Sequence, residues 1–171
     1  MEQKHNLQTQ RFAARLLFVM AGAVSKEVGT FATWFVAGAG ALLAVVMNSA
    51  AGLSSYLQIG NLSGSIKLFL LAAAVNVFQR WLGAMVAGGV ATAAEAEKPA
   101  PEGVDQRGTM ELMKESTLCP IRWQMEKAER AVMGGDLVYG ARRVALLSQW
   151  QSVLLLPQFG LLGWAAWRLL L

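Results

Sequence analysis

The sequence predicts an all-α integral membrane protein with an N-terminal interfacial helix, a two-span hairpin, a cytoplasmic helical segment and a third apolar helix at the C-terminal end. Hydrophobic residues make up 55% of the 171 residues and charged residues only 15%, against about 45–50% and about 25% in soluble domains. No charge occurs between Glu27 and Lys67 or between Arg143 and Arg168. Both tracts reach the roughly 20 residues that a membrane-crossing helix needs. A soluble bundle, the alternative, needs more frequent polar positions along each helix.

Changes in charge and composition divide the chain into five segments. They are an amphipathic helix (1–28), a transmembrane hairpin (29–94), a flexible linker (95–109), cytoplasmic helices (110–151) and a C-terminal membrane helix (152–171). The linker is charged and contains proline, so it has little to bury.

The first segment is predicted to form a helix from Arg11 to Val24, with an apolar face and a basic face. Such a helix fits the membrane interface, with its basic side towards the headgroups. A signal peptide is a rival interpretation, but the apolar core is short and the stretch before it is long. A short packed helix is compatible with either placement.

The clearest span runs from Thr33 to Leu57. Trp34 and Tyr56 are 22 positions apart, which is roughly 33 Å of helix and close to the thickness of the hydrocarbon layer. Aromatic residues at both ends are typical of membrane interfaces. A seam of small residues on one side predicts close helix packing: Ala37, Gly40, Ala41 and Ala44.

Turn-forming residues between Gln58 and Ser65 predict that the chain reverses there. The returning helix, Ile66 to Ala94, carries a polar and small face on an apolar background. This face is the predicted packing surface or pore lining, and it contains Asn76, Gln79, Arg80, Gly83 and Ala87. A second small-residue seam on the same helix contains Ala84 and Gly88.

Arg80 allows two interpretations. It lies 13 residues after Lys67, about 20 Å along the helix axis. From that depth its side chain can extend to the interface beside Trp81. It can instead face other helices in a buried pairing or functional role, since a charge in mid-membrane is costly.

The cytoplasmic segment contains recognisable helix starts and stops. Pro120 suits the first turn of a helix, and the amphipathic stretch Ile121 to Met133 follows, with Glu126 and Arg130 spaced for a pair. Gly134-Gly135 then predicts its end and Asp136 the cap of the next helix.

The last helix is predicted to run from Leu137 into the apolar tract that ends at Leu171, with a kink at Pro157. Trp150 is expected at the membrane interface. The tract either crosses the membrane a third time or lies within it.

Basic residues predict the orientation. They precede the first span and populate the segment between the second and third spans, whereas the turn after the first span carries only Lys67 at its edge. The positive-inside rule then places the N-terminus and the middle segment in the cytoplasm, as in a bacterial inner-membrane protein.

The residues offer little for catalysis. His5 is the single histidine and Cys119 the single cysteine, so we expect no zinc cluster. There is no glycine-rich phosphate loop after a strand and no aromatic-interleaved basic patch. We therefore expect no enzyme activity, no catalytic residue, no cofactor or metal, and no nucleic-acid partner.

Helix association remains as the expected mode of action. The first hypothesis is a scaffold or accessory subunit of a membrane complex, surrounded by lipid and bound to copies of itself or to other subunits. The alternative is a homo-oligomeric pore or membrane-disrupting effector, lined by the face around Asn76, Gln79 and Arg80 and gated by the cytoplasmic helices. A transporter fits less well because no inverted repeat is visible.

Overall fold

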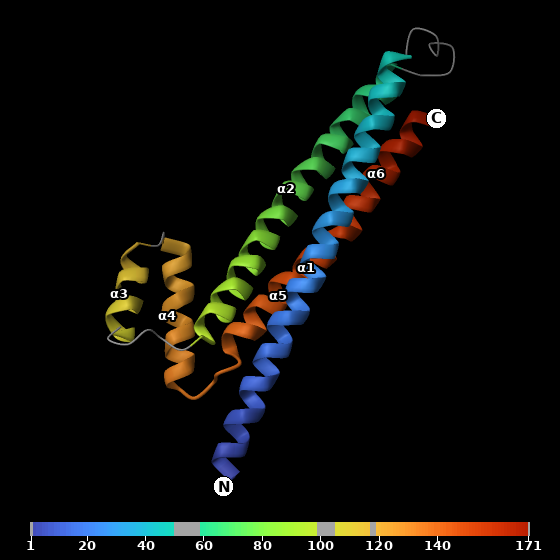
Figure 1. Cartoon of the computed structure of the whole chain (residues 1–171). Coiled ribbons are helices and arrows are strands. Elements are labelled where there is room, and N and C mark those ends of the chain that lie inside the picture. The colour runs from blue at the N-terminus through green and yellow to red at the C-terminus, as the bar shows by residue number, and fades with distance from the viewer. Residues whose placement is uncertain (1, 50–58, 99–104, 117–118, 171) are drawn as a thin grey trace. The chain divides into compact units, whose positions relative to one another are not determined.

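The protein is helical throughout the parts of the chain that the structure, a computed structural model, describes: residues 2–49, 59–98, 105–116 and 119–170 (Figure 1). No strand occurs in those ranges. The helices are α1 (Glu2–Asn48), α2 (Ile59–Ala96), α3 (Gln106–Glu115), α4 (Cys119–Met133), α5 (Tyr139–Val153) and α6 (Leu155–Leu170). The predicted all-α class is therefore confirmed.

Helix α1 is one continuous helix of 47 residues, about 70 Å long. The sequence suggested a helix up to Val24 and a separate span from Thr33, and this expectation is wrong. The charges at Lys26 and Glu27 do not interrupt backbone hydrogen bonding, and a single glycine, Gly29, costs a helix only about 1 kcal/mol. Thr33 instead adds a side-chain hydrogen bond to the Gly29 carbonyl, at 2.8 Å.

Helix α2 begins seven residues earlier than Ile66, at Ile59. The predicted turn up to Ser65 is therefore wrong for residues 59–65, because turn propensity is a weak local preference that helix packing overrides. Ser65 Oγ donates to the Asn61 carbonyl one helical turn earlier, at 2.9 Å. Tyr56, the second expected interface aromatic, lies outside the described residues.

The chain forms two compact units. Unit 1 contains Met1–Ala21 and Gly88–Leu146, and unit 2 contains Gly22–Ala87 and Leu147–Leu171. Long helices contribute to both units, because α1, α2 and α5 each extend from one into the other.

In unit 1, the connection between α4 and α5 follows the predicted capping pattern. Gly135 has a φ of 88°, and its N–H donates to the Val132 carbonyl at 3.0 Å while the Asp136 N–H donates to the Ala131 carbonyl at 2.9 Å. This is a Schellman motif. The Asp136 carboxylate then accepts from the Val138 N–H at 3.1 Å.

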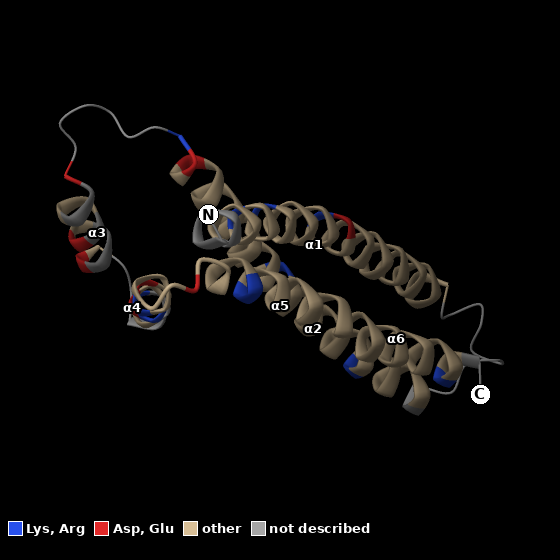
Figure 2. Cartoon of the chain, turned by 90° about the horizontal axis from the view of Figure 1, so that it is seen from below, with Lys and Arg blue, Asp and Glu red and all other residues tan. Residues whose placement is uncertain are grey.

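Helices α3 and α4 of unit 1 carry many charged residues, whereas α6 of unit 2 carries a single one, Arg168 (Figure 2). On α4, Glu126 pairs with Arg122: the Arg122 Nε lies 3.3 Å from the Glu126 carboxylate. The sequence suggested Arg130 as the partner, but Arg130 Nε donates to the backbone carbonyl of Glu126. Both arginines lie four residues from Glu126, so spacing alone does not choose between them.

Unit 2 contains three helical segments side by side: the second half of α1, the first part of α2, and the α5–α6 segment from Leu147 onward (Figure 1). Buried residues on α2 recur every seven positions, at Ser65, Ala72, Gln79 and Val86. A seven-residue repeat is typical of helices that pack as a left-handed coiled coil.

The last helix is interrupted near Pro157, where the sequence predicts a kink. Helix α5 ends at Val153 and α6 begins at Leu155, because Pro157 has no N–H to donate to the Val153 carbonyl. The Leu154 N–H still donates to the Trp150 carbonyl at 3.0 Å, so the two helices continue in one direction (Figure 1).

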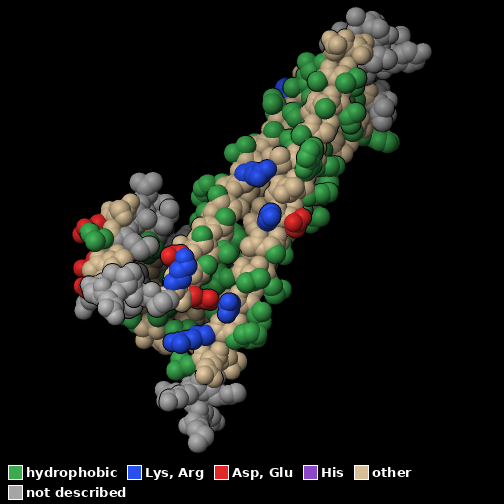
Figure 3. Space-filling model, viewed as in Figure 1, with side chains coloured by type: hydrophobic (Ala, Val, Ile, Leu, Met, Phe, Trp, Pro, Cys, Tyr) green, Lys and Arg blue, Asp and Glu red, His purple; other side chains and the backbone are tan. Residues whose placement is uncertain are grey.

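Two of the helices, over Leu7–Asn48 and Asn61–Ala96, are long and apolar enough to cross a membrane. Only 6% and 11% of their most apolar windows are buried inside the protein, so both windows face mostly outward. Large apolar side chains cover outer faces of the molecule (Figure 3). Helix α6 has 16 residues, fewer than the roughly 20 that a membrane-crossing helix needs. The third span therefore stays a prediction.

Candidate functional site

Three glutamine side chains lie in the core of unit 2. Gln79 of α2 is 0% exposed, and Gln151 of α5 and Gln158 of α6 are each 1% exposed. Every one of them donates its side-chain amide to a backbone carbonyl on a neighbouring helix: Gln79 to Gln151 at 3.2 Å, Gln151 to Ser25 at 3.3 Å, and Gln158 to Ala32 at 3.4 Å. We call this set the amide ladder.

The amide ladder fixes the register of the three helices. Gln151 and Gln158 are seven residues apart, and so are their acceptors Ser25 and Ala32, so α1 and α5–α6 run parallel. In the opposite sense, Ser65 Oγ lies 2.9 Å from the Ala165 carbonyl and shares its single proton between this carbonyl and that of Asn61. Ser65 lies fourteen residues before Gln79 while Ala165 lies fourteen after Gln151, so α2 is antiparallel to α5–α6.

Glycines bring the helices close enough for these bonds. A Cβ atom on Gly83 of α2 would lie 3.0 Å from Gln151 Nε2 and 3.4 Å from Ser25 Oγ, and one on Gly29 of α1 would lie 3.3 Å from the same nitrogen. Real Cβ atoms are seldom that close to a neighbour. The Gln151 amide therefore occupies space that these glycines leave free.

The three ladder glutamines and Asn76 each have a buried side-chain oxygen without a donor in the described part of the chain. Among the described residues, no hydrogen bond reaches the side-chain oxygens of Gln79, Gln151, Gln158 and Asn76. A buried amide oxygen without a partner loses its hydration without compensation, at about 1–3 kcal/mol. These oxygens therefore mark positions where a donor from water or a ligand is favourable.

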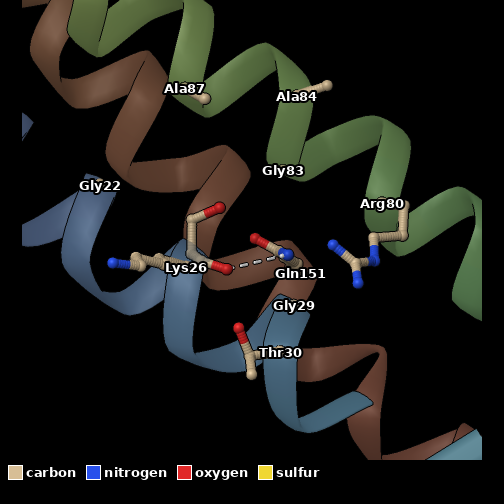
Figure 4. Close-up of a pocket in the computed structure, with 10 residues that line it drawn as sticks. Gly22, Lys26, Gly29, Thr30, Arg80, Gly83, Ala84, Ala87 and Gln151 are labelled. Carbon is tan, nitrogen blue, oxygen red and sulfur yellow. Dashed lines mark hydrogen bonds between the residues drawn. The ribbon is translucent and has the colours of Figure 1, made fainter. Parts of the chain in front are cut away.

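Gln151 also lines a cavity of about 350 Å³. Figure 4 shows Arg80 extending its guanidinium from α2 towards Gln151, Thr30 facing the space from α1, and the ammonium of Lys26 pointing away. No acidic residue lines the cavity. Apart from Lys26, Arg80 and Gln151, the lining residues have small side chains. The complete lining is Gly22, Ser25, Lys26, Gly29, Thr30, Arg80, Gly83, Ala84, Ala87 and Gln151.

The structure brings part of the predicted polar face together. Arg80, Gly83 and Ala87 line this cavity, with Ala84 from the second predicted seam. Gln79 is instead buried in the amide ladder, and Asn76 is half-buried. Arg80 is exposed and pairs with no described residue.

The first predicted seam is mostly outside the core of unit 2. Ala37, Ala41 and Ala44 are exposed, and Gly40 is half-buried, with its missing Cβ 3.1 Å from the ring of Phe69. Gly88 is also exposed, in unit 1. The seam on α1 that faces the other helices of unit 2 instead contains Ser25, Gly29 and Ala32.

The predicted interface tryptophans are exposed, by 74% at Trp34, 55% at Trp81 and 61% at Trp150. Trp81 and Trp150 directly adjoin the cavity residues Arg80 and Gln151 in sequence. Trp34 lies eight residues beyond Lys26, about 12 Å further along α1. Two of the three therefore lie near the level of the cavity.

Sequence reasoning missed Ser25, Gln151 and Gln158. A signal for the last two exists: Ser148, Gln151, Gln158, Leu162 and Ala165 repeat at intervals of three, four and seven, and all are buried. A polar residue at such a repeat position in an apolar tract is expected to fix helix register.

The arrangement defines a class: an all-helical protein with two helices long and apolar enough to span a membrane and a polar, hydrogen-bonded core. In the described part of the chain, no group of three or more His, Cys, Asp or Glu residues is placed to hold a metal ion. No protein-family model, no curated protein and no solved structure matches this chain.

Proposed function

We propose that this protein is a non-enzymatic, multi-span membrane protein that acts through helix association, as a scaffold or accessory subunit of a membrane complex. The observation that carries the proposal is the distribution of polarity in unit 2. Its glutamines are buried in the amide ladder, whereas large apolar residues such as Leu42, at 71%, and Val77, at 69%, are exposed. A fold in water would reverse this pattern, while lipid favours it.

The spacing of basic residues supports the same placement. At one level of unit 2, Lys26 and Arg80 line a single cavity. At another, the Arg168 side chain lies against Gly64. Gly64 and Arg80 are sixteen residues apart on α2, which corresponds to about 24 Å. Basic side chains at both levels can extend outward to the headgroups of a bilayer whose apolar core is about 30 Å thick.

The exposed alanines of α1 supply an association surface. Ala37, Ala41 and Ala44 recur at intervals of four and three on the outside of the helix. Small side chains at this spacing allow another membrane helix to approach closely, and packing of this kind drives association in lipid. We propose that a copy of this protein or another membrane subunit packs there.

Positive-inside counting supports a bacterial inner-membrane location with the N-terminus and the α3–α4 region in the cytoplasm. In this proposal, α3 and α4 present a charged, water-facing surface to partners (Figure 2). The tract containing α6 crosses the membrane a third time.

A homo-oligomeric pore is the second candidate, favoured by the four unpartnered amide oxygens. Against it, Gln79 is 0% exposed within its own chain, so it is not available to line a passage between copies. The scaffold therefore accounts for more of the core than the pore does.

Membrane extraction and vesicle leakage together test the proposal. The tagged full chain is expressed, and its membranes are washed with alkaline carbonate before detergent purification and reconstitution into dye-loaded vesicles. We expect the protein to stay in the washed membranes, to release no dye, and to purify with a second subunit or as a small oligomer. Release into the carbonate supernatant would contradict membrane integration, and dye leakage would support the pore.

A further inference from the structure

Helix α1 carries a second seven-residue repeat, on the side away from the core of unit 2. Its positions are spaced alternately by four and three residues, and every one of them is exposed. A repeat of this spacing is typical of helices that pack as a left-handed coiled coil. The set lies wholly within unit 2. We call it the outer repeat, and it contains Ala23, Glu27, Thr30, Trp34, Ala37, Ala41 and Ala44.

Glu27 places a negative charge in the outer repeat. It is the single acidic residue in the sequence of unit 2. Its side chain is exposed and forms no ion pair or hydrogen bond with the described part of the chain. An unpaired carboxylate at the membrane is unfavourable, because hydrocarbon does not solvate it and anionic headgroups repel it. A cation from outside the chain would therefore stabilise the protein at this position.

Lys26 supplies a matching positive charge beside the outer repeat. Its side chain is exposed, pairs with no described residue, and turns its ammonium away from the cavity of unit 2 (Figure 4). Consecutive residues of a helix do not face each other, so Lys26 is not placed to pair with Glu27 of its own chain. The same surface thus carries one charge of each sign, and it complements a copy of itself.

We propose that a second copy of this chain packs along the outer repeat of α1, with Glu27 of each copy paired to Lys26 of the other. Two copies inserted in the same orientation are related by a two-fold axis along the membrane normal, so their α1 helices run parallel. In a coiled coil, each repeat side chain enters a hole formed by four residues of the facing helix. For Glu27 that hole contains Ala23, Lys26, Glu27 and Thr30 of the second copy. The two lysines offset the repulsion between the two glutamates.

The other members of the outer repeat fit this arrangement. Ala37, Ala41 and Ala44 allow the two backbones to approach closely. Trp34, which is 74% exposed in the single chain, gains contacts with the facing helix. Apolar contacts alone tolerate several registers, whereas a polar position in an apolar repeat specifies one register. The two ion pairs therefore determine how the second copy is aligned on α1.

This inference rests on the proposed membrane placement and narrows the association surface to one partner, so charge reversal tests it. Full chains carrying donor or acceptor dyes are reconstituted together into phosphatidylcholine vesicles, and energy transfer is measured as the protein is diluted with lipid. We expect the unmodified protein to dimerise. Glu27→Lys and Lys26→Glu should each weaken dimerisation about tenfold or more, because two ion pairs are lost and like charges meet.

Mixing the two variants separates a lost ion pair from a misfolded chain. Glu27→Lys presents only positive charge at this level of the outer repeat, and Lys26→Glu presents only negative charge. A mixed dimer restores both ion pairs, so energy transfer between the two variants should approach that of the unmodified protein. Glu111→Lys makes the same change in charge at an exposed position of α3 and should dimerise like the unmodified protein.

Disulfide formation tests the parallel alignment. In a Cys119→Ser background, Ala41→Cys lies at a repeat position that meets the same position of the second copy, so mild oxidation should give a cross-linked dimer. Leu42→Cys, next to it in sequence, lies outside the outer repeat and is exposed in the single chain. It should remain largely monomeric under the same conditions.

A monomeric chain in vesicles, unchanged dimerisation of Glu27→Lys, or a mixture that associates no better than either variant alone would overturn the inference while leaving the membrane placement intact. Equal cross-linking at positions 41 and 42 would overturn it in the same way. Release of the protein from carbonate-washed membranes would overturn both.

Discussion

Gln151 and Gln158, one heptad apart, make the same hydrogen bond to α1, with side-chain nitrogens 3.3 and 3.4 Å from the carbonyls of Ser25 and Ala32. Those carbonyls belong to a continuous helix, so each glutamine adds a second donor to an acceptor already used within α1. The bonds therefore add interhelical register without removing helical hydrogen bonds. In lipid, such side-chain contacts average about 0.6 kcal/mol, so their main contribution is to alignment.

The first prediction tests this register. The rings of Phe35 and Phe159 lie 4.4 Å apart between centroids, so cysteines at these two positions should cross-link efficiently with a short bismaleimide in a Cys119→Ser background. The matched control pairs Phe35→Cys with Ala166→Cys, one heptad further along α6. Equal cross-linking of the two pairs, measured by gel mobility, would mean that the register is not fixed.

The second prediction concerns the amide of Gln79. Gln79→Glu should destabilise unit 2 by about 3 kcal/mol or more at neutral pH, because a buried carboxylate then faces the Gln151 carbonyl without a partner. Gln79→Leu removes donor and unsatisfied oxygen together and should change stability by less than about 1.5 kcal/mol. Unfolding in mixed micelles by denaturing detergent measures both. Similar losses in the two variants would show that the hydrogen bond itself, and not charge burial, dominates.

The third prediction compares two glycines. Gly83→Ala places a Cβ 3.0 Å from Gln151 Nε2 and should destabilise the fold by about 1–3 kcal/mol through overpacking. Gly38→Ala meets nothing within 4 Å and should stabilise helix α1 by up to about 1 kcal/mol. The same micelle unfolding assay measures both variants. An unchanged free energy of unfolding in Gly83→Ala would mean that α2 and α5 are not in close contact at this level.

The fourth prediction concerns association. Ala37→Leu with Ala41→Leu fills an exposed face of α1, so it should leave the unfolding transition unchanged while blocking close approach of a partner helix. Ala74→Leu, on an exposed position of α2, is the matched control. Size-exclusion chromatography with light scattering in detergent should show a smaller complex only for the α1 variant. An unchanged complex would assign the interface elsewhere.

The fifth prediction concerns the α4–α5 connection in unit 1. Gly135 has a φ of 88°, and a residue with a Cβ there costs about 1–2 kcal/mol. Gly135→Ala should therefore increase proteolysis between α4 and α5, whereas Gly134→Ala, at a glycine without a positive φ, should have little effect. Chymotrypsin can cleave the connection at Leu137, and equal cleavage of the two variants under limited chymotrypsin would contradict the Schellman motif.

Local signals predicted the helical class, the capping at Gly135 and Asp136 and the break near Pro157, because each depends on a few neighbouring residues. The break expected between Val24 and Thr33 is absent, since the charges there leave the helix intact. The true seam on α1 was missed because small residues identify a packing face only when the partner helices are known. The contacts of Gln151 with Ser25 and of Gln158 with Ala32 each join residues 126 positions apart. The pattern of a single helix does not contain that information.

The central claim is that lipid surrounds the outer faces of unit 2 while the amide ladder lies inside. Spin labels at Leu42 and Val77, both more than two-thirds exposed, test it directly through their collision rates with oxygen, which concentrates in lipid, and with a water-soluble nickel chelate. In reconstituted bilayers we predict high oxygen and low nickel accessibility at both positions. High nickel accessibility at both would mean that water covers these faces, and would contradict the account.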